Sequence, residues 1–322
     1  MRQRGEHKMR DAVVIVGCGM MGSGIGAMAA LSGRRTILVD VDEAHTCRGR
    51  KKATECICLR KENALVTEQV AERAVTLLET STDLAASVKK AFLVIEAIVE
   101  NLPAKQKLFA EIDHLLPPEI PICSNTSGLQ ITQIAALCSY PERTVTTHFW
   151  LPAHLVPLVE VVMGSHSDET MAKNVMEELR RWKKTPVLVR KDLPGQLANR
   201  IFQAIIREAV DIVASGLASA EDVDTAISCG MAMRFPEWGP LMHLDAIGLQ
   251  LGLAVQDSVL PDLCTDRKAN EYLRQLVAEG KLGSSTGEGF YDWKKRDIAE
   301  DMRKRDHFII GAVKLKEQLD GE

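Results

Sequence analysis

The sequence lacks the features that mark membrane, secreted and nucleic-acid-binding proteins. Its longest apolar runs, such as Ala91–Val99, are broken by charge well short of a bilayer span. Residues Met1 to Asp11 are polar and lack the apolar stretch of a secretory signal. The net charge is −4, with neither a basic excess nor an acidic tail. We therefore expect a cytoplasmic protein that binds neither membranes nor nucleic acid.

Paired cysteine motifs, repeats and several catalytic signatures are also missing. The eight cysteines are scattered, and Cys56 and Cys58 form a close couple without a second ligand pair. Reduced packing cysteines are the expected state, and no metal site is predicted. The chain has no internal repeat, low-complexity segment, Walker loop or serine nucleophile elbow.

What the 322 residues do contain is an alternation of buried strands and helices. The expected strands are Ala12–Val16, Thr36–Val39, Phe92–Ala97, Ile120–Ser124, Thr144–Phe149 and Pro157–Val162. The expected helices are the stretch that ends at Ser32, Arg48–Leu78, Ala104–Leu116 and Ile131–Leu137. This order predicts an α/β fold with a mostly parallel, doubly wound sheet of Rossmann type.

The pattern of apolar and polar residues changes near Lys191, because almost only helical periodicity follows it. The later helices are expected at Leu197–Ser215, Ala220–Cys229, Pro240–Asp257, Asn270–Glu279 and from Ile298 onward. We predict an α/β domain over residues 1–191 and an all-helical domain over residues 192–322.

A glycine-rich turn follows the first expected strand and opens the first expected helix. It reads Gly17, Cys18, Gly19, Met20, Met21, Gly22, which fits the dinucleotide fingerprint. Glycines allow the backbone to approach a pyrophosphate, and the helix N-terminus supplies amide donors. The alternative is a plain packing turn. The strand–turn–helix–strand context favours the dinucleotide site, with Gly17, Gly19, Met20, Met21 and Gly22 as cofactor-binding residues.

Asp40 ends the next strand, about twenty residues beyond the glycine turn. A carboxylate at this position accepts hydrogen bonds from ribose hydroxyls and repels a 2′-phosphate. The predicted cofactor is therefore NAD. Arg34 and Arg35 precede the strand, which disfavours a phosphate clamp for NADP.

Glu160 lies in an apolar strand, where a carboxylate is costly to bury without a partner. A sheet-stabilising salt bridge is one interpretation. The other pairs Glu160 with His148, at the end of a neighbouring strand. The carboxylate would fix the imidazole tautomer, and the ring would take a hydroxyl proton as hydride leaves for NAD. His154 and His243 are the nearest rivals, but neither has such a partner.

With these residues in place, the chain resembles the 3-hydroxyacyl-CoA dehydrogenase family, which includes relatives acting on carnitine, L-gulonate and other hydroxy acids. The resemblance spans almost the whole chain. Its motifs are the glycine turn, Ile95–Asn101, Ser124–Ser127, His148-Phe149, Leu158–Val161, Pro194-Gly195 before Asn199-Arg200, and Gly287–Tyr291.

The resemblance implies roles that agree with those of His148 and Glu160, and it adds others. Ser127 and Asn199 would contact the substrate's oxygens, although a helix cap and a solvated helix residue are the plainer interpretations. Glu100 and Lys105 would touch the dinucleotide. The helical domain would form a homodimer and close over the substrate, in an enzyme of fatty acid metabolism.

Three departures from the family pattern leave the substrate open. Leu151 replaces the usual asparagine three residues after the histidine, and Ser285 replaces a common lysine. The lysine-rich helix that meets CoA phosphates is only partly kept. Its basic residues are Arg48, Arg50, Lys51, Lys52, Arg60 and Lys61.

The leading hypothesis is oxidation of a 3-hydroxyacyl-CoA to the 3-oxo thioester. The second keeps this chemistry on a small free hydroxy acid of the carnitine, L-gulonate or aromatic type. The third is a crystallin-like or sensing NAD-binding protein with little turnover. A short-chain dehydrogenase is disfavoured, because its tyrosine–lysine spacing occurs only at Tyr291 and Lys295, after the helical domain.

Overall fold

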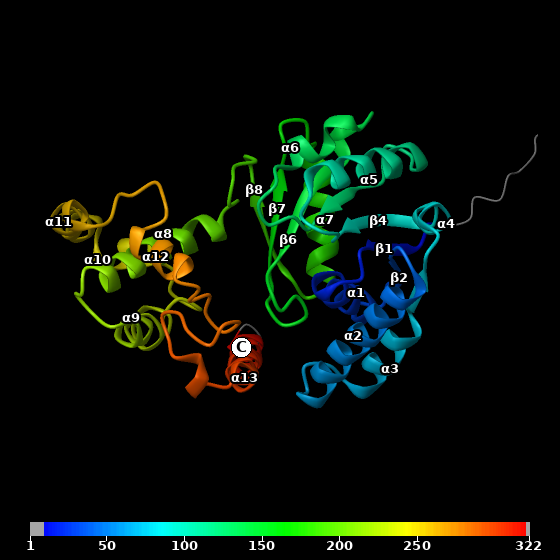
Figure 1. The fold of residues 1–322 in the computed structure, drawn as a ribbon. Helices are drawn as coiled ribbons and strands as arrows, with labels where there is room; N and C mark the ends of the chain where they lie inside the picture. The colour runs from blue at the N-terminus through cyan, green and yellow to red at the C-terminus, as the bar shows by residue number, and fades with distance from the viewer. Residues whose placement is uncertain (1–9, 320–322) are drawn as a thin grey trace, which may run out of the picture. The chain divides into compact units, whose positions relative to one another are not determined.

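The computed structural model describes residues 10–319, which form two compact units. Residues 10–198 and 309–314 belong to the first unit, and residues 199–308 and 315–319 to the second. Figure 1 shows the sheet of the first unit in blue to green and the helices of the second in yellow-green to red.

The first unit is built on an eight-stranded sheet with the order β3-β2-β1-β4-β5-β6-β7-β8. The strands are β1 (Ala12–Val16), β2 (Arg35–Val39), β3 (Leu78–Ser81), β4 (Ala91–Glu96), β5 (Ile122–Ser124), β6 (Thr144–Phe149), β7 (Leu158–Met163) and β8 (Thr185–Val189). All neighbouring strands are parallel except the β6–β7 pair. The predicted Rossmann-type α/β fold with a helical second part is confirmed.

Helices cover both faces of this sheet. They are α1 (Met20–Leu31), α2 (Glu43–Glu62), α3 (Glu68–Thr76), α4 (Leu84–Val88), α5 (Leu102–Leu115), α6 (Ile131–Ile134) and α7 (Glu169–Arg181). One apolar cluster joins the sheet to α1, α2, α3 and α7, and the other joins it to α4, α5 and α6. The strand period of two explains why β1 serves both, since Val13 and Ile15 face the first cluster and Val14 and Val16 the second.

The expectation of one helix over Arg48–Leu78 is wrong. The chain forms α2 and α3 separately and then enters β3. Ala64, between the helices, has φ 52, a left-handed conformation that a continuous helix does not allow. Thr67 then caps α3 by accepting a hydrogen bond from the Val70 amide (3.3 Å).

Two further elements, α7 and β8, fall in a stretch for which no element was expected. Strand β7 runs antiparallel to β6 and parallel to β8, so it reverses the chain direction beside the catalytic candidates. This reversal places residue 148 directly opposite residue 160 in the β6–β7 register.

The second unit contains helices and loops. Its helices are α8 (Ala198–Ala214), α9 (Ala220–Ala226), the π-helix Ile227–Met231, α10 (Pro240–Ile247), α11 (Leu249–Val259), α12 (Glu271–Ala278) and most of α13 (Ile298–Leu319). The single helix expected over Pro240–Asp257 is wrong, because Gly248 at φ 95 separates α10 from α11. Within residues 10–319, no helix is long and apolar enough to cross a membrane.

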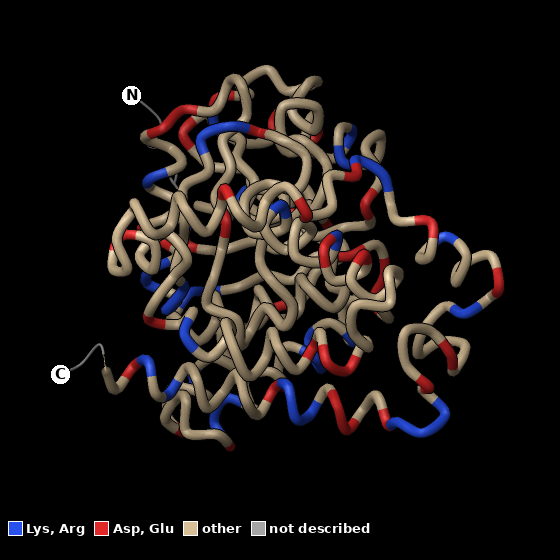
Figure 2. The backbone as a smooth tube through the Cα atoms, turned by 90° about the vertical axis from the view of Figure 1, so that its left-hand side faces the viewer, with Lys and Arg blue, Asp and Glu red and all other residues tan. Residues whose placement is uncertain are grey.

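Charges of both signs are interspersed along the chain. Figure 2 shows basic and acidic segments alternating along the backbone rather than gathered by sign. In α13 alone, Arg303 and Lys304 approach Glu300, at 2.7 Å and 3.8 Å. Such exposed pairs affect stability little, so the packing of the apolar clusters is what holds the first unit together.

Candidate active site

The glycine turn is shaped by close backbone approach. Gly17 has φ +100. A Cβ on it would lie 2.6 Å from the carbonyl oxygen of Ala97, the residue directly after the neighbouring strand β4. A Cβ on Gly22 would lie 1.8 Å from the carbonyl oxygen of Gly17. Any larger residue at either position would push the turn apart, so both glycines are required by sterics.

Gly19 differs, because a Cβ built on it would meet nothing within 4 Å. It is the N-cap residue of α1, and Met20 and Met21 open the first turn. The open space therefore lies at the amino end of a helix, where amide groups and the helix dipole favour a phosphate. This arrangement fits a dinucleotide pyrophosphate.

Asp40 directly follows β2 and is tied to the glycine turn. Its Oδ2 accepts a hydrogen bond from the Cys18 amide at 2.7 Å, and its Oδ1 accepts one from the Val41 amide at 2.8 Å. A carboxylate has about four acceptor positions, so two remain for the hydroxyls of a ribose. Asp40 thus supports the glycine turn and keeps acceptor positions for a ribose, and its contact with the adenosine ribose stays a prediction.

His148 and Glu160 form a buried hydrogen-bonded pair across the β6–β7 register. The distance from His148 Nδ1 to Glu160 Oε2 is 2.8 Å. Glu160 is fully buried, and His148 is 8% exposed. Because Nδ1 faces the carboxylate, the neutral ring places its proton there and leaves Nε2 as a proton acceptor.

Three further donors hold the same carboxylate. The indole of Trp150 donates to Oε2 at 3.0 Å, and the amides of Leu197 and Ala198 donate to Oε1 at 2.8 and 2.9 Å. Burial raises the pKa of Glu160, but these hydrogen bonds together with the one from His148 outweigh burial and lower the pKa to about 2. Glu160 is therefore a permanent anion near neutral pH.

Ser127 lies on an exposed loop after β5, and that loop is held by Glu100. Glu100 Oε1 accepts from the hydroxyl of Thr126 at 2.5 Å and from the amides of Ser127 and Gly128 at 3.1 Å. The N-cap residue of α6 is Gln130, so Ser127 is not that helix's cap.

Lys105 is almost fully buried, with its ammonium facing two carboxylates. Its Nζ lies 2.5 Å from Glu96 Oε1 and 3.4 Å from Glu100 Oε2. The lysine therefore fixes Glu100 and, through it, the Ser127 loop.

Asn199 is in the second unit, in the first turn of α8, where its Oδ1 accepts a long hydrogen bond from Gln203 (3.4 Å). Its chain neighbour Ala198 is one of the donors to Glu160.

Two of the positions that depart from the family pattern lie on the surface of turns or in local contacts. Leu151 is 47% exposed in the turn after β6, and the Ser285 hydroxyl donates to the Leu282 carbonyl (3.2 Å).

Only part of the basic set on α2 faces solvent. Arg48, Lys51 and Lys52 are exposed and share one face of the helix, since they are three and four residues apart. Arg60 is 5% exposed and donates to the His154 carbonyl at 2.7 Å. Its guanidinium therefore serves the fold rather than an external phosphate.

Two supporting residues escaped the sequence-based search. The indole of Trp150 donates to Glu160, and Asn125 Oδ1 accepts from the Phe149 amide at 3.0 Å, which ties the β5 loop to the end of β6. The position of Trp150, two residues after His148, would have been a usable signal, because alternate residues at a strand end point the same way. Asn125 lies within the Ser124–Ser127 motif, from which only Ser127 was predicted to have a role.

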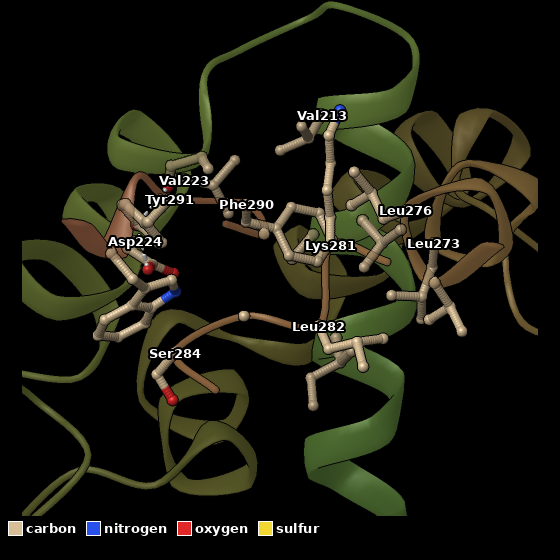
Figure 3. A pocket seen from close by; sticks show the side chains of 18 residues that line it. Val213, Val223, Asp224, Leu273, Leu276, Lys281, Leu282, Ser284, Phe290 and Tyr291 are labelled. Carbon is tan, nitrogen blue, oxygen red and sulfur yellow. Dashed lines mark hydrogen bonds between the residues drawn. The ribbon is translucent and has the colours of Figure 1, made fainter. Parts of the chain in front are cut away.

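A cavity of ≈ 630 Å³ lies within the second unit, and its walls are mainly apolar. Val213, Leu276 and Phe290 point into it (Figure 3). Tyr291, at its edge, donates to Asp224 at 2.5 Å. Burial, then the hydrogen bond to Asp224, raises the pKa of Tyr291 to about 12, which makes it unsuited to act as a base near neutral pH.

Comparison with known families assigns both parts of the chain. The sequence-family model described as "3-hydroxyacyl-CoA dehydrogenase, NAD binding domain" matches residues 12–193. The family model for the C-terminal domain of the same enzyme matches residues 195–293. The hydroxyacyl-coenzyme A dehydrogenase of Sus scrofa mitochondria is 35% identical over 293 residues, covering 88% of this chain and 91% of the relative.

Another relative is described by a different substrate. The 5-formyl-3-hydroxy-2-methylpyridine 4-carboxylate 5-dehydrogenase of Mesorhizobium japonicum is 32% identical, covering 95% of this chain and 98% of its own. A crystal structure described as this type of dehydrogenase, an NAD⁺-dependent dismutase, matches with a TM-score of 0.85 over 95% of this chain and 98% of that chain.

A structure of (S)-3-hydroxybutyryl-CoA dehydrogenase from Ralstonia eutropha matches with a TM-score of 0.72 at 33% identity, over 88% of this chain and 99% of that chain. The family models, the curated relatives and the Rossmann-type unit agree. The chain therefore belongs to the 3-hydroxyacyl-CoA dehydrogenase family and is an NAD-dependent dehydrogenase that acts on a CH–OH group.

Proposed function

We propose that His148 is the general base of this dehydrogenase and that Glu160 orients it. The observation that carries the proposal is the buried pair at 2.8 Å, with Glu160 held as an anion by four donors. His148 Nε2 takes the proton of a secondary hydroxyl, and the imidazolium that results is stabilised by the carboxylate. NAD supplies the hydride acceptor when bound.

The cofactor-binding residues are proposed from the shape of the glycine turn. Gly17, Gly19 and Gly22 let the backbone approach the pyrophosphate, and the first-turn amides of Met20 and Met21 face it. Asp40 would accept from the adenosine ribose. Glu100, held by Lys105, would border the nicotinamide half through the loop that it fixes.

Ser127 and Asn199 are proposed as polar contacts to the oxygens of the substrate. The support for Ser127 is its exposed position on a loop whose backbone is fixed by Glu100. The support for Asn199 is its place directly after Ala198, which donates to the catalytic carboxylate. Each would polarise the carbonyl that forms as the hydroxyl is oxidised.

We propose a 3-hydroxyacyl-CoA as the first substrate candidate, which would place the reaction in fatty acid metabolism. The exposed face of α2 with Arg48, Lys51 and Lys52 offers charges for the phosphates of the CoA nucleotide. The thioester relatives, at 35% identity, support this choice.

A small free aromatic hydroxy acid is the second candidate. It is favoured by the likeness to the pyridine carboxylate dehydrogenase, which covers 95% of the chain. Leu151 gives an apolar side chain to the turn after His148, and buried Arg60 is withdrawn from the basic face of α2. Both features suit a small aromatic substrate better than a nucleotide handle.

The test is NADH formation, followed by absorbance, with L-3-hydroxybutyryl-CoA against free 3-hydroxybutyrate, carnitine, L-gulonate and a hydroxymethylpyridine carboxylate. Turnover confined to the thioester supports the first candidate, and turnover confined to a free acid supports the second. NAD binding without turnover of any of them would favour a binding protein.

The base is tested by His148→Gln, which should lower turnover by about a hundredfold or more while the affinity for NAD stays the same. Unchanged turnover would remove His148 as the base.

We infer that the helical domain, proposed over residues 192–322, also forms a homodimer. Its support is the amount of exposed apolar surface. Among the described residues of α11, Leu249, Leu251 and Leu253 are each more than half exposed, and Gly252 is the buried one.

A cytoplasmic location is inferred from the eight unpaired cysteines, which a reducing compartment keeps as thiols.

A further inference from the structure

The turn at residues 150–157 joins the two strands that carry His148 and Glu160. Two buried cations hold it through its backbone. Lys184 Nζ donates to the carbonyls of Ala153 at 2.5 Å and Val156 at 2.7 Å. Arg60 Nη1 donates to the carbonyl between them, that of His154, at 2.7 Å. Three carbonyls within four residues thus face two cations from different parts of the first unit.

Both side chains are buried, at 5% exposure each, which costs free energy. Burial, and then the charge of Arg60, lowers the pKa of Lys184 to about 7, so the carbonyl contacts offset only part of that cost. The backbone is arranged to direct Lys184 inward. Helix α7 ends at Arg181, and Lys183 adopts φ 59, so that the Lys184 amide donates back to the Leu179 carbonyl at 3.1 Å. The ammonium of Lys184 also lies 6.0 Å from the centre of the Phe149 ring, next to His148 in the chain.

The turn reaches the catalytic carboxylate through its first residue. Trp150 Nε1 donates to Glu160 Oε2, the same oxygen that His148 Nδ1 contacts. On its other side the turn packs against the cofactor helix α1, since a Cβ on Gly24 would lie 3.2 Å from the Cβ of Ala153. A shift of the turn would therefore move the indole donor and change the position of the Glu160 carboxylate relative to the ring of His148.

We propose that Lys184, assisted by Arg60, is a positioning residue for the dehydrogenation step. Each side chain acts by fixing carbonyls of the turn, and the turn fixes the indole N–H of Trp150 on Glu160. This proposal rests on the assignment of His148 as the base. It extends the active site to residues that lie outside the cofactor and substrate motifs.

A double-mutant cycle tests the proposal. Lys184→Met removes the clamp, and Trp150→Phe removes the indole donor through which it is proposed to act. With the hydroxy substrate that the wild type turns over, we expect Lys184→Met to lower kcat about tenfold and to change the KM for NAD by less than about twofold, because misplacement of a catalytic group affects the chemical step. Lys184→Arg should restore most of kcat.

In the Trp150→Phe background, Lys184→Met should lower kcat by less than about twofold, because its target is already gone. The same tenfold loss in both backgrounds would overturn the proposal, as would an Lys184→Met enzyme with normal kcat and only a lower Tm. Lys173→Met, at an exposed lysine of α7, is the matched control.

If Lys184→Met fails to fold, the cycle runs with Arg60→Met, which removes the donor to the carbonyl of His154. An uncoupled Arg60→Met effect would equally contradict the proposal. The base assignment is tested separately, since an active His148→Gln enzyme would overturn that assignment and leave the coupling between Lys184 and Trp150 measurable.

Discussion

At the scale of single residues, the fold solves the problem of an anion buried in a sheet by surrounding it with donors. Glu160 Oε2 receives the imidazole and the indole, and Oε1 receives two amides. An apolar strand alone would have forced this carboxyl to take up a proton. Because it stays ionised, it can fix the ring of His148 and balance the positive charge of the imidazolium.

Replacing Glu160 by glutamine should disturb both activity and stability. An amide keeps one accepting oxygen, so its NH₂ must face either the His148 and Trp150 donors or the Leu197 and Ala198 amides. We expect kcat to fall about a hundredfold or more and the free energy of unfolding to fall by about 1–3 kcal/mol. Steady-state kinetics and urea unfolding measure the two effects, and normal kcat would show that the pair is only structural.

The lowered pKa of Glu160 also predicts how stability depends on pH. Its folded-state pKa is about 2, below the ordinary value of about 4.3 in an unfolded chain. The stabilisation is therefore complete above that ordinary value and is lost as pH falls towards 2, by about 3 kcal/mol in all. Urea unfolding between pH 5 and pH 2.5 should show the wild type approaching Glu160→Gln. Glu169→Gln should converge with the wild type much less, because the ion pairs of Glu169 with Lys173 and Arg190 are exposed and screened by solvent. Parallel curves for the wild type and Glu160→Gln would contradict the assignment.

Two substitutions can separate the structural role of Asp40 from the cofactor-selecting role that we propose for it. Asp40→Ala should weaken NAD binding, because the Cys18 amide also loses its acceptor. Asp40→Asn keeps the size and one acceptor but removes the charge, so the preference for NAD over NADP should fall about tenfold or more with less loss of NAD binding. The ratio of kcat/KM values for the two cofactors measures this, and an unaltered ratio would show that Asp40 does not meet the ribose.

Residue patterns predicted the central pair but not its surroundings. An acidic residue in an apolar strand and a histidine at another strand's end are visible along the sequence, and the register indeed joins them. The donors at Leu197 and Ala198 are backbone amides 37 and 38 residues from Glu160, so no side-chain type marks them. Lys184 is likewise an ordinary lysine until the fold brings it to the turn.

At the scale of elements, the missed features are those whose sequence signal is weak. Strand β3 has one buried residue, Leu78, and lies at the sheet edge, so it carries little of the apolar alternation by which strands are recognised. The break between α2 and α3 depends on the left-handed conformation of Ala64, for which alanine gives no signal. Gly248 between α10 and α11 was visible, and its φ of 95 is the reason that the helix stops there.

The end of α7 offers a prediction of its own. Lys183 takes a left-handed conformation at φ 59, which costs a residue with a Cβ about 1–2 kcal/mol. Lys183→Gly should therefore stabilise the protein, by about 0.5–1 kcal/mol after the greater unfolded-state entropy of glycine is included. Lys173→Gly, in the middle of α7, should do the opposite by about 1 kcal/mol. Urea unfolding compares the two, and destabilisation by Lys183→Gly would mean that its side chain is needed at this turn.

At the scale of the whole molecule, the two units differ in how they bury apolar residues. The sheet unit has extensive fully buried clusters, whereas the described helices of the second unit expose many large apolar side chains. A helix that is apolar on all sides is stable in water only when other elements cover it. In α11, Leu249 is 65% exposed and Leu253 is 62% exposed, so the helical unit is expected to need a second copy to cover it.

This expectation can be tested by mass in solution. Leu253→Glu would place a charge in the proposed interface, and a symmetric dimer would contain it twice, so association should weaken by at least roughly 2 kcal/mol, which raises Kd about thirtyfold. Size-exclusion chromatography with light scattering should then shift from a dimer towards a 35.5 kDa monomer as protein is diluted. Leu137→Glu, at a 63% exposed leucine of the sheet unit, is the control and should leave the dimer intact. A wild-type monomer at micromolar concentration, or a dimer equally resistant in both variants, would mean that α11 is covered in another way.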